Sequence, residues 1–126
     1  MEMALQKQEQ ILCKALHTDL GKSKTESVMC EIGLVQGEIR WMKQHLGRLC
    51  RQKHVRTPLA QFAAKSYQSP SPYGNVLIMS PWNYPVLLTL EPLVDAIAAG
   101  NTAVVKPSAY AVSYTHLRAH ETRRHL

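Results

Sequence analysis

The sequence predicts an α/β fold in which amphipathic helices come first and a strand, a helix and a second strand follow. The first 50 residues carry apolar side chains at steps of three and four, which is the spacing of helices. Two short runs rich in β-branched and aliphatic residues, 76–79 and 102–106, flank a helical segment. Such a strand, helix and strand unit predicts parallel strands in one sheet.

The first helix is expected over residues 3–20, where one face is apolar. Gly21 follows it, at the place where a left-handed glycine commonly caps a helix. The apolar face consists of Leu5, Ile11, Leu12, Ala15 and Leu16.

A second helix is expected from Ser23 to about residue 51, because Ser23 and Glu26 have the spacing of a capping box. A stripe of this length, about 40 Å at 1.5 Å per residue, also fits a coiled coil. We favour packing against a domain core, because Gly33 and Gly37 would weaken a free helix and suit close approach by a neighbouring element. The stripe consists of Val28, Ile32, Val35, Ile39, Met42, Leu46 and Leu49.

Residues 52–74 are expected to connect the two parts, with one short strand over 61–67. The strand over 76–79 is expected to be buried on both faces. The following helix starts near Pro85, which suits a first turn, and stops before Gly100. Helices thus occupy residues 3–52, and the strand, helix and strand unit occupies residues 75–106.

Ligands of parallel sheets bind at the carboxyl ends of the strands. In this chain those ends are residues 80–83 and 106–108. The sequence therefore predicts a binding site where these two short segments meet.

Composition fits a globular protein, with 45% hydrophobic and 19% charged residues in 126. No run of 18 uncharged apolar residues and no signal-peptide layout is present, so we expect no membrane span and a cytoplasmic location. The three cysteines, Cys13, Cys30 and Cys50, form no Cys-x-x-Cys pair, and we expect reduced, buried structural thiols.

The formal charge of +6 includes a run from Lys43 to Lys65 without an acidic residue. Such a run can bind nucleic acid. We favour a solvated helix end and loop, because no aromatic residue lies within its cationic core and no nucleic-acid motif accompanies it. We therefore expect no nucleic-acid partner.

Three spaced motifs carry a more specific signal. The first covers residues 72–85 and contains Pro-Trp-Asn-Tyr-Pro at 81–85, the second covers 93–102, and the third is Val-Lys-Pro-Ser at 105–108. In this order they resemble the aldehyde dehydrogenase superfamily, specifically its class 3-like branch. The resemblance covers about residues 4–111 and implies an incomplete fold in which a doubly wound, Rossmann-like coenzyme domain begins.

In that family a cysteine thiolate adds to the aldehyde, hydride passes to a nicotinamide, and water hydrolyses the thioester. The resemblance implies that the Asn83 side-chain amide stabilises the oxyanion. The alternative is a turn asparagine that bonds to local backbone, and the neighbouring Trp82 and Pro85 favour the catalytic role.

The resemblance also implies a coenzyme site for NAD or NADP. Lys106 matches the lysine that contacts the adenosine ribose, and Tyr84 matches a residue that faces the aldehyde. Many family members carry a glutamate that favours NAD where this chain has Ala109, so both coenzymes stay open. The implied coenzyme-binding residues are Met79, Ser80, Pro81, Trp82, Lys106 and Ser108.

The family's glycine-containing coenzyme loop, general-base glutamate and nucleophilic cysteine lie beyond residue 111. Residues 112–126 hold neither cysteine nor glycine, and residues 113–122 resemble a translated library adapter, so we expect a non-native tail on an inactive fragment. His116 and His120 have the spacing of metal ligands on a helix but lack a third ligand, so we expect no metal site.

The resemblance implies that the full-length parent binds a small aldehyde and forms a homodimer. Two alternatives stay open. One is an acyl-CoA or acyl-phosphate reductase of the same superfamily. The other is a non-enzymatic helical interaction module built on the stripe of residues 28–49.

Overall fold

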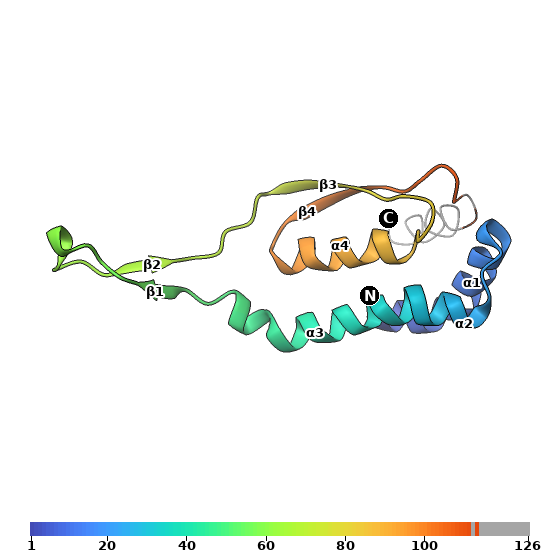
Figure 1. Cartoon of the computed structure of the whole chain (residues 1–126), viewed down its shortest axis with the longest axis horizontal. Coiled ribbons are helices and arrows are strands. Elements are labelled where there is room, and N and C mark those ends of the chain that lie inside the picture. Colours follow the sequence, from blue (N-terminus) through green and yellow to red (C-terminus); the bar gives the residue numbers. More distant parts are fainter. Residues whose placement is uncertain (112, 114–126) are drawn as a thin grey trace.

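The computed structural model describes residues 1–111 and 113. Helices α1 (Glu2–Leu20), α2 (Lys24–Ser27) and α3 (Gly33–Leu49) form one layer. Helix α4 (Leu87–Ala98) lies between this layer and the sheet of β3 (Asn75–Met79) and β4 (Thr102–Lys106), as Figure 1 shows. The predicted α/β class, with helices first and a strand, helix and strand unit second, is confirmed.

Helix α1 has the bounds that its apolar face predicts, within one residue. Gly21 adopts the left-handed conformation with φ 68°, and its backbone N–H donates to the His17 carbonyl at 2.9 Å. The predicted glycine cap is therefore confirmed.

The second helix is not continuous, contrary to the prediction. Ser23 caps α2 by accepting from the Glu26 N–H at 3.1 Å, but a π-helical turn, η1 (Val28–Ile32), separates α2 from α3. Gly33 caps this turn at its C-terminal end, and a Cβ atom there would lie 2.8 Å from the Val28 carbonyl oxygen. Gly37 would meet nothing within 4 Å, so the close approach predicted for it is wrong.

The apolar stripe packs inside the molecule. Ile32, Val35 and Ile39 are buried in one cluster with side chains of α1 and α4. Leu46 and Leu49, at the far end of the stripe, are exposed. Full burial of an aliphatic side chain contributes about 1.5–3 kcal/mol. Packing against a domain core is confirmed, and the coiled-coil alternative is wrong for the buried part of the stripe.

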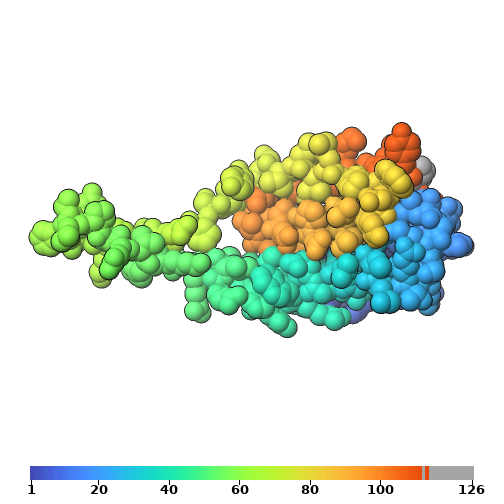
Figure 2. Space-filling view, in the orientation of Figure 1, coloured from blue at the N-terminus to red at the C-terminus, as the bar shows by residue number. Residues whose placement is uncertain are grey.

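Residues 52–74 form an arm that projects from the body, as Figure 2 shows. Its antiparallel strands are β1 (Lys53–Val55) and β2 (Ser66–Gln68), with a 3-10 turn η2 (Leu59–Gln61) near the tip. The predicted strand over 61–67 is wrong at its start, because the chain turns at residues 58–64 and pairs only from Ser66.

Strands β3 and β4 pair in parallel from Asn75 opposite Thr102 to Met79 opposite Lys106, which confirms the predicted unit. The expectation that the first strand is buried on both faces is wrong. Ile78 is buried, but Leu77, Met79 and Val104 are 61%, 69% and 64% exposed. One face of the sheet is thus bare, whereas sheets of this class carry helices on both faces.

The bare face predicts that the isolated chain associates with itself. Leu77 and Val104 are cross-strand partners on it, so Leu77→Thr with Val104→Thr should lower the associated fraction in sedimentation velocity. Leu34→Thr, at a half-exposed position of α3, is the matched control and should change little. A monomeric parent chain with a cooperative melting transition would contradict this prediction.

Candidate active site

The carboxyl ends of β3 and β4 lie side by side. Met79 pairs with Lys106, and the Ser80 N–H extends the ladder by donating to the Lys106 carbonyl at 3.1 Å. The structure thus brings together the two segments, 80–83 and 106–108, that the sequence predicts as a binding edge.

A buried hydroxyl pair closes the turn between β3 and α4. Thr89 Oγ1 bonds both to the Pro85 carbonyl and to Ser80 Oγ, the latter at 2.7 Å. The Pro85 carbonyl can only accept, so it takes the Thr89 proton, and Ser80 supplies the proton of the other bond. The Ser80 hydroxyl and the Ser80 N–H are therefore both committed to bonds within the fold.

Asn83 lies in this turn with its side chain exposed. Its side-chain amide bonds to no group in the part of the chain that the structure describes, so the alternative of a locally satisfied turn asparagine is not supported. Its backbone carbonyl accepts from Lys22 Nζ at 2.8 Å. The backbone of Asn83 is held while its amide faces solvent.

Lys22 and Glu31 form a buried ion pair beneath the turn, with Nζ and Oε1 2.6 Å apart. The Lys22 ammonium also lies 3.7 Å from the centre of the Tyr84 ring. Sequence reasoning assigned neither charged residue a role. A signal existed for Glu31, because it lies three residues after Val28 and four before Val35, on the apolar face.

The other predicted site residues border the same edge. Pro81 and Trp82 are exposed, and so are Lys106 and Ala109. Ser108 is half-buried and its hydroxyl accepts from the Tyr110 N–H at 3.2 Å. Tyr84 is half-buried against Lys22, and its predicted contact with the aldehyde stays a prediction.

The cysteines belong to the helical layer. Burial, and next the charge of Glu9, raise the pKa of Cys13, so its thiol stays protonated at neutral pH. All three thiols are free. The expected burial is confirmed for Cys13, but Cys30 is only half-buried, and the expectation is wrong for Cys50, which is exposed at the end of α3. None lies in the segments that form the strand ends.

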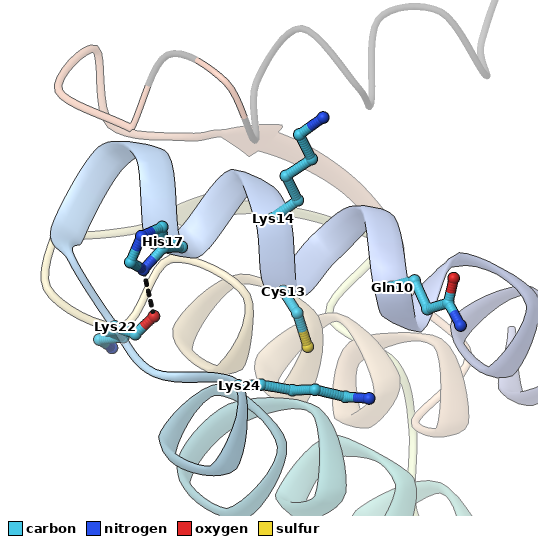
Figure 3. Close-up of a pocket in the computed structure, with 6 residues that line it drawn as sticks. All are labelled: Gln10, Cys13, Lys14, His17, Lys22 and Lys24. Atoms are coloured by element: carbon cyan, nitrogen blue, oxygen red, sulfur yellow. Dashed lines mark hydrogen bonds between the residues drawn. The ribbon is translucent and has the colours of Figure 1, made fainter.

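A separate hollow of about 280 Å³ lies beside α1 (Figure 3). It is open to solvent, and within it the His17 ring bonds to the Lys22 carbonyl at 3.0 Å. Its other lining residues are Gln10, Cys13, Lys14 and Lys24. None of these residues comes from β3, β4 or the turn, so this hollow is distinct from the strand-end site.

The family model described as "Aldehyde dehydrogenase family" matches residues 1–122. The chain belongs to the aldehyde dehydrogenase family. This match runs past residue 111, where the motif resemblance ends. The predicted non-native tail, 112–126, with His116 and His120, lies outside the described residues apart from Ser113 and stays a prediction.

Named relatives agree with this assignment. The chain is 46% identical over 108 residues to the 4,4'-diaponeurosporen-aldehyde dehydrogenase of Staphylococcus aureus, covering 86% of this chain and 24% of that protein. It is 43% identical over 104 residues to human aldehyde dehydrogenase family 3 member B1, covering 82% and 22%. The chain therefore spans about a quarter of the length of these aldehyde dehydrogenases.

A solved structure described as the substrate-bound state of Staphylococcus aureus AldH superposes with a TM-score of 0.86 at 45% identity. The superposition covers 89% of this chain and 24% of that one. The partial aldehyde dehydrogenase fold that the sequence predicts is thus confirmed.

Every helix in residues 1–111 and 113 is too short or too polar to span a membrane. The same residues contain no group of three or more His, Cys, Asp or Glu side chains that could hold a metal ion.

The buried hydroxyl pair predicts that Thr89→Val lowers the free energy of unfolding by about 1–2 kcal/mol, because the Ser80 hydroxyl loses its partner. The measurement is urea denaturation. It is made in a chain that also carries Leu77→Thr and Val104→Thr, which reduce self-association. The matched control is Thr18→Val, which removes a similar hydroxyl bond to the carbonyl four residues earlier, at an exposed position of α1. Equal losses for both variants would contradict the prediction.

Proposed function

We propose that this chain is the N-terminal segment of an NAD(P)-dependent aldehyde dehydrogenase that oxidises aldehydes to carboxylic acids. The observation that carries the proposal is the exposed amide of Asn83, in a turn whose backbone is held at the carboxyl end of β3. Membership of the aldehyde dehydrogenase family supports it.

In the proposed reaction Asn83 donates a hydrogen bond to the oxygen of the aldehyde as negative charge develops there. Such a donor helps most when it is in place before the charge forms, because no reorganisation is then needed during the reaction. The fixed carbonyl of Asn83 meets this requirement for the backbone, and its unbonded side-chain amide is available to donate.

The strand ends fit a nicotinamide coenzyme. Lys106 is exposed beside Met79, so its ammonium can donate to ribose hydroxyls, and the exposed Pro81 and Trp82 extend the same edge. When bound, the coenzyme supplies the acceptor of the hydride. The proposed contacts are made by the backbone of Met79 and Ser80 and by Pro81, Trp82, Lys106 and Ser108, with Tyr84 toward the aldehyde.

We propose that the chain alone does not oxidise aldehydes. The reaction needs a thiolate beside the Asn83 amide, and Cys13 is buried with a raised pKa in the helical layer. The nucleophile would come from a part of the parent enzyme that residues 1–126 do not include. This chain would then supply the oxyanion donor and one edge of the coenzyme site.

The remaining proposals concern the parent enzyme, which would act on an aldehyde as a cytoplasmic homodimer. The superfamily alternative is an acyl-CoA or acyl-phosphate reductase. The two relatives described above are aldehyde dehydrogenases, which favours the oxidation. The packing of the apolar stripe inside the core disfavours the helical interaction module.

The role of Asn83 is tested in a full-length chimera, in which residues 1–111 replace the matching segment of the Staphylococcus aureus relative. Asn83→Ala should lower kcat by about 100- to 1,000-fold with little change in KM, because the lost bond forms fully only in the transition state. The measurement is steady-state aldehyde oxidation.

Two variants control for this test. Asn83→Asp keeps the shape but removes the donor, so it should be as inactive as Asn83→Ala. Gln44→Ala removes an exposed amide from α3 and should leave kcat unchanged. A kcat for Asn83→Ala within threefold of the parent chimera would contradict the proposal.

The coenzyme preference is tested at Ala109, which is exposed three residues after Lys106. In the chimera Ala109→Glu should raise KM for NADP about tenfold, because the carboxylate repels the 2′-phosphate, while KM for NAD stays within twofold. Ala109→Gln has similar size without the charge and should leave both values near those of the parent. An equal effect of both variants would contradict the charge argument.

A further inference from the structure

Glu31 connects the helical layer to the start of α4. Its side chain is fully buried. Oε1 bonds to Lys22 Nζ at 2.6 Å, and Oε2 accepts from the backbone N–H groups of Val86 at 2.8 Å and Leu87 at 3.2 Å. Val86 is the N-cap residue of α4 and provides no side-chain bond, so a carboxylate from 55 residues earlier caps this helix.

Lys22 holds the turn that precedes α4. Besides Glu31, its ammonium bonds to the Asn83 carbonyl at 2.8 Å and contacts the Tyr84 ring. The bonded carbonyl belongs to Asn83 itself, so the bond from Lys22 fixes the orientation of the peptide group that follows the Asn83 Cα atom. Lys22 therefore holds the residues before Pro85, and Glu31 holds the residues after it.

We propose that Lys22 and Glu31 are positioning residues that aim the Asn83 amide at the oxyanion. This inference rests on the proposed role of Asn83. The Asn83 side chain is exposed, so its own packing does not fix its direction, and the constraint comes from its backbone. A misplaced donor loses most of its effect on the rate, because stabilisation of the transition state depends on geometry set beforehand.

The π-helical turn η1 offers a way to move Glu31 without removing a charge. The Gly33 N–H bonds to the Val28 carbonyl across this turn. A Cβ atom at residue 33 would lie 2.8 Å from that carbonyl oxygen, so Gly33→Ala must displace backbone in the turn that carries Glu31.

The test uses the full-length chimera with Lys22→Met and Glu31→Gln combined, which removes both charges together. We expect kcat to fall at least tenfold while KM for the coenzyme changes less than twofold, because Lys106 and the strand ends are untouched. In the Asn83→Ala background the same pair of changes should lower kcat less than twofold, because the donor that they aim is already absent.

Three outcomes separate the claims. An unchanged kcat for the pair variant overturns the positioning role, and so does an equal fall with and without Asn83, which would mark general structural damage. An unchanged kcat for Asn83→Ala alone refutes the proposed oxyanion role instead. If the pair variant does not fold, Gly33→Ala takes its place, with an expected fall in kcat of at least threefold that is again absent in the Asn83→Ala background.

The exposed ion pairs of Glu2 with Arg40 and Lys43 provide the matched control. They connect α1 to α3, with N–O distances of 3.1 Å, and make no contact with the turn before α4. Glu2→Gln with Arg40→Met should leave kcat unchanged in both backgrounds. A fall as large as that of the buried pair would overturn the positioning role.

Discussion

The buried ion pair of Lys22 and Glu31 is the constraint on which the arrangement of this chain depends. Removing a charge from water costs several kcal/mol per ion, so a buried pair persists only when further bonds satisfy both partners. Here the carboxylate also accepts two backbone N–H groups, and the ammonium also bonds to a carbonyl and an aromatic ring. The extra partners all belong to residues 83–87, so the cost of burial is offset only when the turn and α4 are docked on the helical layer.

The buried hydroxyls complement this pair on the other side of the turn. Thr89 and Ser80 join α4 to the end of β3. Glu31 joins the start of the same helix to η1, and Lys22, between α1 and α2, holds the turn before it. Asn83 lies between the Ser80–Thr89 bond and the bonds of Glu31 to the start of α4, so its backbone is held on both sides. Functional groups on loops gain precision from rigid neighbours in this way.

Local patterns predicted the parts of the fold that depend on local rules. The glycine cap at Gly21, the serine cap at Ser23 and the parallel strand pair follow from turn chemistry and periodicity. The π-helical turn was not predicted, and neither was the pairing of its Glu31 with backbone N–H groups 55 and 56 positions later, which no local pattern encodes. For the site, the motif located Asn83 and Lys106 on one edge, but the commitment of the Ser80 hydroxyl to Thr89 required coordinates.

The π-helical turn has a consequence for the lengths that related sequences can tolerate here. A π-helical bond spans one residue more than an α-helical bond, so deleting one residue between 28 and 32 would allow a regular α-helix. It would also rotate the preceding segment by about 100° relative to α3, because each residue of an α-helix turns by that angle. Indels should therefore be rare at this turn, whereas the exposed tip of the arm, at residues 59–62, can accept them freely.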